Sequence, residues 1–267
     1  MSRTKITRRH RYRGASMNGQ SHFITLRLLK GFTLVVDQAR IPVCSSTQRL
    51  LAFLALQGMP RSRTYVAGIL WPDVTASRAN ANLRSSLWRA ARTGHPVIDA
   101  TARELALSQH IVVDLHEAMA RAHRLLDRSC PCDDILTLQT LTDLSADLLP
   151  EWPDNDWMMI EQEQYRQLRL YALEAMTERL TSARRYGEAV AAGLAAVRTE
   201  PLRESAHQVL MKAHLAAGNR GAALRQFEHC RRILREELGL EPSTSLRDLV
   251  PLRGEHGEQS RPEPYSG

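Results

Sequence analysis

Hydrophobic and polar residues alternate in short runs between Phe23 and Val43. Two pairs of turn-forming residues, Lys30-Gly31 and Asp37-Gln38, separate these runs. A period of two that is interrupted by turn residues is typical of short β-strands that bury one face. The pattern therefore predicts a small antiparallel meander in this region.

Three helices are predicted after the meander, because apolar residues then recur at every third or fourth position. Polar residues that can cap a helix stand at the three predicted starts, which are Ser46 or Thr47, Ser62, and Ser77. The first helix ends before Gly58, and the second ends near Trp71 because Pro72 restricts the residue before it. The third helix covers residues 78–92.

A two-stranded hairpin is predicted next. Its strands are Val97-Ile98 and residues 105–107, and a polar turn at residues 100–103 joins them. A small sheet, three helices and a hairpin, in this order, form a winged helix-turn-helix. We therefore expect residues 22–113 to fold as a winged helix-turn-helix domain of the α+β class.

The second half of the chain is predicted to be helical. Amphipathic segments cover residues 115–127, 133–144, 155–182, 186–198, 202–217 and 220–237. Residues 183–189 are similar to residues 217–223 at an offset of 34, which is the period of tetratricopeptide repeats. Phe227 occupies the aromatic position of the repeat, whereas Gly193 replaces it in the first copy. The pattern predicts a mainly α protein in which residues 114–250 form a tetratricopeptide-like domain.

The two ends of the chain lack hydrophobic periodicity. Residues 1–21 carry six Lys and Arg among small and polar residues, and residues 251–267 are also polar. Such segments cannot bury enough apolar surface to fold, so both are predicted to be disordered tails.

The charge of the sequence changes sign at the boundary between the two predicted domains. Residues 1–113 hold 17 of the 36 Lys and Arg but only four of the 29 Asp and Glu, which gives a net charge of +13. Residues 114–267 have a net charge of −6. Without the tail, residues 21–113 still have a net charge of +7. This division predicts a basic module for a polyanion, joined to an acidic module with another role.

Composition and motifs exclude several classes of protein. No run of about 18 apolar residues could span a membrane. The basic N-terminal segment is not followed by the apolar core of a signal peptide, so we expect a cytoplasmic protein. The sequence contains none of the common nucleotide-binding or hydrolase motifs, and we expect neither an enzyme nor a cofactor.

A few conspicuous side chains of the second half are better explained by packing than by chemistry. Cys130 and Cys132 lack the usual spacing of zinc ligands, so no metal site is predicted even though two histidines precede them, His116 and His123. His207 and His214 are expected to pack or to lie at the surface. Trp152 and Trp157 are expected to anchor the core of the helical half.

The predicted third helix separates apolar from basic side chains. At 100° per residue, an apolar stripe faces the core, and it consists of Ala79, Leu83, Leu87 and Ala90. The opposite side carries polar residues, which are Arg78, Ser85, Arg89 and Arg92, with Arg84 on its flank. The helix contains no acidic residue, whereas an ordinary exposed helix mixes charges to form ion pairs. We therefore predict that this face enters the major groove of DNA, where Arg binds guanine, rather than serving solubility alone.

Residues outside the third helix are candidates for contacts with phosphate. Arg61 and Arg63 precede the second helix, where free N–H groups and the helix dipole favour an anion. Thr101 and Arg103 occupy the tip of the hairpin and could reach the minor groove or the backbone. The alternative for each of the four is a solvated loop residue. Phosphate contacts would position the domain without reading sequence.

Motifs in both halves resemble one known family. In the first half they are Arg49 to Leu56, Leu70-Trp71-Pro72-Asp73, and Leu83-Arg84 followed by Leu87-Trp88-Arg89. In the second half they are Leu148-Leu149-Pro150, Tyr186-Gly187-Glu188-Ala189, and the most specific run, from Leu234 to Ser243. Residues 22–250 thus resemble the antibiotic-regulatory-protein family of bacterial transcriptional activators. This family joins an OmpR-type winged helix to a bacterial transcriptional activation domain.

The resemblance implies a sequence-specific activator that binds direct repeats in a promoter and recruits RNA polymerase. Its partners would be double-stranded DNA, the polymerase and a second copy of the chain, and its location would be the nucleoid. The DNA contacts would come from the exposed face of residues 78–92 and from the hairpin near residues 101–103. The basic N-terminal extension departs from the family pattern and implies additional non-specific affinity.

Two other interpretations stay open. One is a tetratricopeptide-type scaffold whose basic half docks nucleic acid or an acidic protein without specificity. The other is a sensor that binds a small molecule on the concave face of the repeats. Specific reading of DNA predicts a large affinity ratio between promoter and scrambled duplexes that persists with salt, whereas charge attraction predicts similar steep salt slopes for both.

Overall fold

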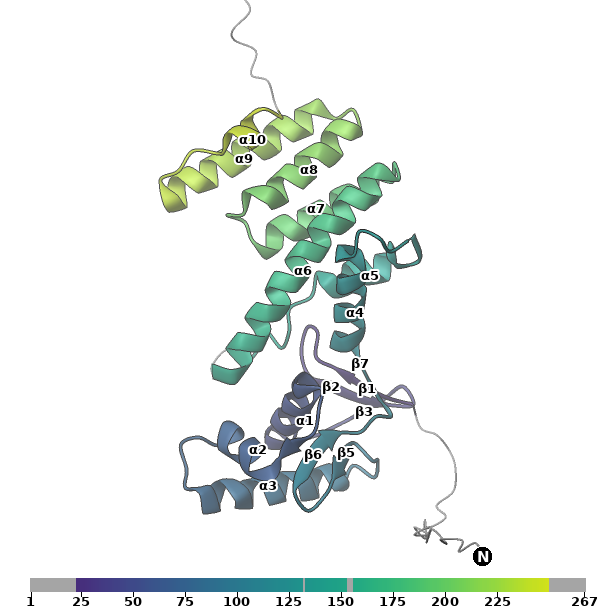
Figure 1. The fold of residues 1–267 in the computed structure, drawn as a ribbon, viewed down its shortest axis with the longest axis vertical. Coiled ribbons are helices and arrows are strands. Elements are labelled where there is room, and N and C mark those ends of the chain that lie inside the picture. The colour runs from purple at the N-terminus through teal and green to yellow at the C-terminus, as the bar shows by residue number, and fades with distance from the viewer. Residues whose placement is uncertain (1–22, 132, 153–155, 250–267) are drawn as a thin grey trace, which may run out of the picture.

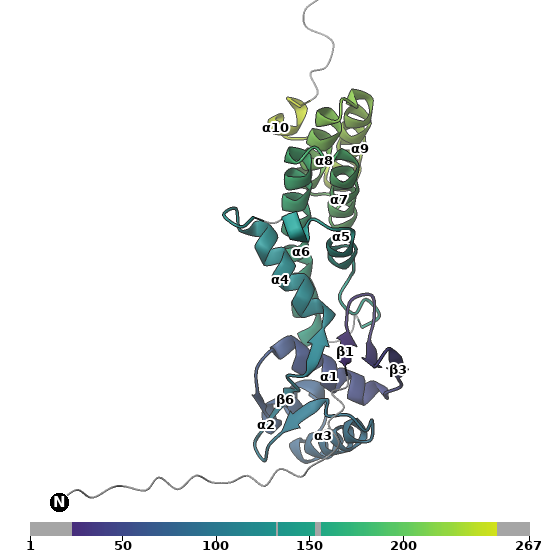
Figure 2. The ribbon, with the colours of Figure 1, turned by 90° about the vertical axis from the view of Figure 1, so that its right-hand side faces the viewer.

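The computed structural model describes residues 23–131, 133–152 and 156–249. The two predicted tails, 1–21 and 251–267, lie outside these residues. The described chain is mainly α-helical, with a small α+β part followed by stacked helices, as the sequence predicts. Figures 1 and 2 show an elongated molecule, with the α+β part at one end and the last helices at the other.

The first sheet has four strands in the order β3-β2-β1-β7. Their bounds are Ile24–Arg27 for β1, Thr33–Val36 for β2, Ala39–Ile41 for β3 and Ile111–Val113 for β7. β1 pairs antiparallel with β2, which pairs antiparallel with β3, so the predicted meander is confirmed. β7 pairs parallel with β1 and is a strand that the sequence pattern did not predict.

Three helices follow the meander, and their bounds are Ser45–Gln57 for α1, Arg63–Leu70 for α2 and Ala76–Ala91 for α3. Ser62 caps α2 as predicted, because its hydroxyl accepts a hydrogen bond from the backbone N–H of Tyr65. The other two predicted caps are wrong. α1 has Cys44 at its N-cap and no side-chain cap, and the hydroxyl of Thr75, not that of Ser77, accepts from the N–H of Arg78 in α3.

The predicted hairpin is present and belongs to a three-stranded sheet with the order β4-β6-β5. The strands are Arg61–Ser62 for β4, Ile98–Ala100 for β5 and Glu104–Leu107 for β6. The sequence pattern predicts no strand at β4, whose residue Arg61 pairs with Leu105 of β6. The sheet therefore places the tip of the hairpin beside the start of α2.

The second half of the chain is a series of helices. The bounds are Asp114–Leu126 for α4, Leu138–Leu144 for α5, Asp156–Ser182 for α6, Tyr186–Thr199 for α7, Glu204–Ala216 for α8, Arg220–Leu238 for α9 and Thr244–Arg247 for α10. The predicted helix over residues 133–144 is instead a short 3-10 turn, Asp133–Ile135, followed by α5. From α6 to α9 each helix packs against the next, which is the stacking expected of repeats.

Gly193 explains the departure of the first repeat from the expected pattern. The residue is buried in α7, and a Cβ at this position would lie 3.1 Å from the Cβ of Leu210 in α8. An aromatic side chain would not fit there. The missing side chain thus lets α7 and α8 approach each other closely.

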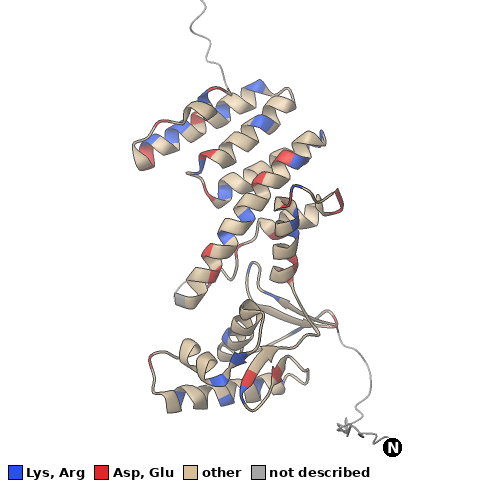
Figure 3. Cartoon of the chain, in the orientation of Figure 1, with Lys and Arg blue, Asp and Glu red and all other residues tan. Residues whose placement is uncertain are grey.

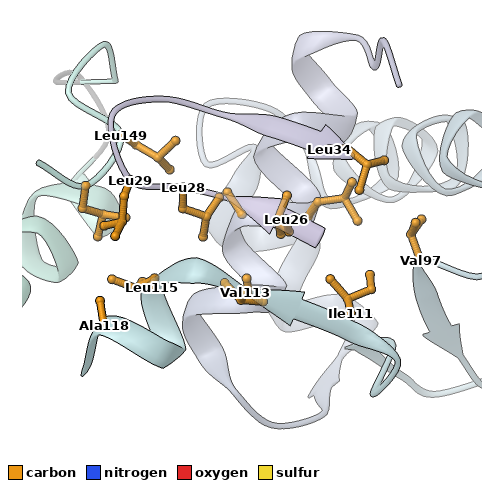
Figure 4. Close-up of a cluster of buried hydrophobic side chains, with 14 of the residues drawn as sticks. Leu26, Leu28, Leu29, Leu34, Val97, Ile111, Val113, Leu115, Ala118 and Leu149 are labelled. Carbon is orange, nitrogen blue, oxygen red and sulfur yellow. The ribbon is translucent and has the colours of Figure 1, made fainter. Parts of the chain in front are cut away.

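One hydrophobic cluster joins the α+β part to the helical part. It contains Leu26 and Leu34 from the first sheet and Leu115 and Ala118 from α4, and Leu149, which precedes α6, also belongs to it (Figure 4). Burial of such side chains is the main force that stabilises a fold. The two parts therefore share a core.

Two tryptophans near the start of α6 contribute to this shared core. The ring of Trp152 stacks on Phe32 with centroids 6.1 Å apart, and Trp157 meets Phe53 of α1 edge-on at 5.2 Å. The expectation that both anchor the core of the helical half is wrong. The start of α6 reaches the α+β part, so these aromatic rings pack on it instead.

The chain passes from β7 to α4 without a loop, since β7 ends at Val113 and α4 begins at Asp114. The carboxylate of Asp114 accepts hydrogen bonds from the backbone N–H groups of Leu28 and Leu29, at 2.8 and 3.2 Å. Burial raises the pKa of this carboxyl, although the N–H donors favour its charged form. Asp114 thus connects the end of β1 to the start of α4.

Candidate nucleic-acid interface

α3 buries the side that the sequence pattern predicts. Ala79, Leu83 and Ala90 are buried, and Leu87 is half-buried against the same cluster. Ser86 is buried on this side as well. The partners of the stripe come from α1, α2 and β6, and they include Leu50, Leu54, Val66, Leu70 and Leu105. Packing on three elements therefore fixes the rotation of α3 about its axis.

The opposite side of α3 is open to solvent. All five residues predicted to read DNA are exposed there, namely Arg78, Arg84, Ser85, Arg89 and Arg92. Figures 1 and 3 show α3 at the end of the molecule that lies away from the helical half, with basic residues along it. The helical half therefore does not cover this face.

The arginines of α3 have no carboxylate partners among the described residues. Arg89 donates through Nη1 to the hydroxyl of Ser46 at the start of α1, at 3.1 Å. The guanidinium carbon of Arg92 lies 4.8 Å from the centre of the Trp88 ring. Within the described part of the chain, no ion pair therefore neutralises their positive charges.

Trp88 also lies on this face of α3. It is not among the predicted DNA-binding residues, because these are selected for their charge or hydroxyl group. Its side chain is 59% exposed. The periodicity of the helix places residue 88 opposite the buried stripe, so helical geometry alone was sufficient to locate it. A large apolar ring thus lies among the arginines.

The start of α2 and the tip of the hairpin lie side by side. Residues from both could therefore contact the same stretch of a phosphate backbone. The side chain of Arg63 donates through Nε to the backbone oxygen of Thr101 at 2.9 Å, and its backbone N–H donates to the oxygen of Arg103 at 3.0 Å. Thr101 and Arg103 are exposed. The structure therefore brings three of the four predicted residues to one place.

Besides Arg63, which bonds to the hairpin, two more of these four residues have roles within the fold. Arg61 is half-buried, and its guanidinium carbon lies 5.6 Å from the centre of the Tyr65 ring. The hydroxyl of Thr101 accepts from the backbone N–H groups of Arg103 and Glu104, at 3.2 and 2.9 Å, so it shapes the turn. Arg103, which is exposed, is therefore the best placed of the four to meet a phosphate.

The described residues contain no group of three or more His, Cys, Asp or Glu that could hold a metal ion. Cys132, one member of the cysteine pair considered above, lies outside those residues. His207 is buried and packs, as one of the two expectations for it states. Within the same described ranges, no helix combines the length and the apolar character that crossing a membrane requires.

Comparisons with known proteins agree with this architecture. Residues 112–251 match the family described as the bacterial transcriptional activator domain. Among solved structures, the chain is similar to Mycobacterium tuberculosis EmbR in complex with a low-affinity phosphopeptide, with a TM-score of 0.67 and 20% identity over 86% of this chain. The match covers 64% of the EmbR chain, and at this identity it establishes the fold. No curated protein sequence matches this chain.

The family match begins within β7 and continues through the helical half. It spans more than half of the chain. The chain therefore belongs to the bacterial transcriptional activator domain family, as its resemblance to the antibiotic-regulatory-protein activators predicts.

Proposed function

We propose that this protein is a sequence-specific activator that reads double-stranded DNA with the exposed face of α3. The observation that carries the proposal is the segregation of charge on this helix. Arg78, Arg84, Arg89 and Arg92 are all exposed, and no acidic residue is present on α3. A helix that presents only positive charge at the end of a helix-turn-helix suits the major groove, where Arg can donate two parallel hydrogen bonds to guanine.

The start of α2 and the tip of the hairpin supply contacts with the DNA backbone in this proposal. The positive end of the α2 dipole and the charges of Arg63 and Arg103 favour a phosphate. Arg61 and Thr101 support these groups through the sheet and the turn. These contacts orient α3 and do not discriminate between sequences.

The two halves have separate tasks in this proposal. Residues 22–113 bind DNA, and residues 114–250 contact RNA polymerase and a second copy of the chain on direct repeats. The family membership and the exposed position of the helical half support this division. The regulator would act in the cytoplasm at the nucleoid.

The proposal is tested by selecting duplexes from a random-sequence pool with the full chain and measuring binding to the selected duplex by fluorescence anisotropy. Specific complexes usually exceed non-specific ones by roughly 1,000-fold or more. We expect an affinity ratio of that order against a scrambled duplex, and we expect it to persist as salt rises. Equal affinities with equal salt slopes for the two duplexes would instead establish the non-specific scaffold.

A further inference from the structure

Trp88 lies outside the hydrophobic core of the described residues. Its ring is 59% exposed, and it belongs to none of the hydrophobic clusters formed by the described residues. Exposed indole is costly in water because about 25 cal/mol is lost for each Å² of apolar surface left unburied. The position therefore suits a residue whose apolar surface is covered by a partner.

Arg92 fixes the ring in place. It follows Trp88 by one turn of α3, and its guanidinium carbon lies 4.8 Å from the ring centre. With this cation–π contact in place, 59% of the Trp88 side chain is still exposed. A ring that is held in this way loses little conformational freedom on binding.

The major groove offers one apolar group to such a ring. Each base edge presents donors and acceptors, and only thymine adds a methyl group, at C5. Arg84 and Ser85 lie one turn before Trp88 on the same face, so polar groups beside the ring can bond to the neighbouring bases. Trp88 thus occupies the place on α3 where an apolar contact with a base would be made.

We propose that Trp88 recognises thymine by packing its indole against the C5-methyl group, with Arg92 as the residue that positions the ring. The inference rests on the proposed reading of DNA by α3. It assigns a specificity-determining role to a side chain that carries no charge.

The test uses the selected duplex and the full chain. Each thymine is replaced in turn by deoxyuridine, which removes only the methyl group. For the wild-type protein we expect a roughly fourfold loss of affinity when one particular thymine of each repeat is replaced. This loss corresponds to the free energy of burying one methyl group, about 0.8 kcal/mol. For Trp88→Ala we expect weaker binding overall and no further loss at that thymine.

Two control variants separate this role from a structural one. Trp88→Phe retains an apolar ring, so the variant should keep part of the sensitivity to the methyl group. Tyr171 of α6 is the matched control, because its ring is 47% exposed and lies 4.4 Å from the guanidinium carbon of Arg203. Tyr171→Ala should leave the affinity and the effect of each deoxyuridine unchanged.

The outcomes distinguish the two proposals. If the wild-type protein selects a sequence but tolerates deoxyuridine at every thymine, Trp88 does not read the methyl group. The same conclusion follows if Trp88→Ala keeps the full methyl dependence, and Trp88 would then serve a protein partner. If no sequence is selected from the pool, the proposed reading of DNA itself is wrong.

Discussion

Leu83 and Arg84 are neighbours on α3 and lie in opposite surroundings. Leu83 is buried in the core of the α+β part, whereas Arg84 is exposed on the face proposed to bind DNA. Adjacent residues of a helix are separated by 100°, so a single step along the chain changes the environment completely. The roles of these two side chains can therefore be separated by mutation.

Arg84→Ala is expected to lower the affinity for the selected duplex by about tenfold or more, because a bidentate contact with a base is worth roughly 1–3 kcal/mol. The melting temperature of the Arg84→Ala variant should equal that of the wild-type protein. Leu83→Ala is expected to cost about 2–5 kcal/mol of folding free energy through the cavity that it creates. Thermal unfolding followed by circular dichroism, together with anisotropy, measures both effects. A large loss of stability in Arg84→Ala would show that this arginine is structural.

His207 makes the stability of the helical half depend on pH. The ring is buried, Nε2 bonds to the oxygen of Pro201 at 2.8 Å, and Nδ1 bonds to the amide of Gln226 at 2.7 Å. Burial lowers the pKa of His207 below its ordinary value of 6.5, and the nearby ring of His229 acts in the same direction. Protonation thus occurs more readily in the unfolded chain than in the folded one.

The contribution of His207 is complete above pH 6.5 and is lost as the pH falls through its lowered pKa. We expect the wild-type melting temperature to fall between pH 7 and pH 5 by more than that of His207→Gln. Calorimetry across this range measures the difference. Parallel pH profiles for the two proteins would assign the acid sensitivity to other groups.

Two cysteines are expected to differ in reactivity. Hydrogen bonds with the hydroxyls of Ser46 and Thr47, at 3.4 and 3.3 Å, lower the pKa of Cys44 to about 6. Burial raises the pKa of Cys230 to about 12. Because the thiolate is the nucleophile, iodoacetamide at pH 7 should modify Cys44 first, as peptide mass spectrometry would show. Equal labelling of the two in the folded protein would contradict this difference, and equal labelling in urea is the control.

At the scale of elements, the periodicity of apolar residues predicts most of the helices and strands. α1, α2, α3 and the long helices of the second half follow directly from it. The short strands β4 and β7 could not be found in this way. β4 has only two residues. β7 is a strand because it pairs with β1, which lies far away in the sequence. Such pairing depends on tertiary contacts rather than on local pattern.

Local sequence pattern also fails to predict the helix caps and some contacts within the candidate DNA-binding site. Several Ser and Thr residues stand near the starts of α1 and α3, and only the backbone path decides between Thr75 and Ser77. The exposed arginines of α3 follow from the helical period. The contact between Arg63 and the hairpin does not, because it joins residues 38 positions apart. The partners of Trp152 and Trp157 are distant in sequence for the same reason.

The close approach of α7 and α8 gives a prediction at this scale. Gly193→Ala places a methyl group 3.1 Å from the Cβ of Leu210 and 3.2 Å from its Cα, so Leu210 must shift by a few tenths of an ångström. Overpacking of this kind typically costs about 1–3 kcal/mol, and the melting temperature should fall. Gly187→Ala in the same helix is the control, since nothing lies within 4 Å of a Cβ there. Equal effects of the two changes would mean that helix propensity, not packing, dominates.

For the molecule as a whole, the shared core makes the two halves depend on each other. Trp157 of α6 packs on Phe53 of α1, and the cluster that contains Leu26 and Leu115 crosses the same boundary. Contacts of this kind make unfolding cooperative across a boundary. We expect one thermal transition for the described parts of the chain rather than two.

Trp157→Ala should weaken both halves together, with a loss on the order of 2 kcal/mol because the ring is only partly buried. Differential scanning calorimetry should show a single transition at lower temperature. Ile160→Ala on the same helix is the control, since its side chain is 60% exposed. A variant that melts like the wild type would show that the tryptophan does not couple the halves.

In the proposed complex, the direct step from Val113 to Asp114 would fix the direction in which the helical half projects from the DNA. Two copies on neighbouring sites then point the same way only when their sites are separated by whole turns, about 10.5 base pairs each. A half-turn insertion would send the two projections to opposite sides of the duplex. The spacing between sites on a promoter would therefore decide whether both copies can reach a single polymerase.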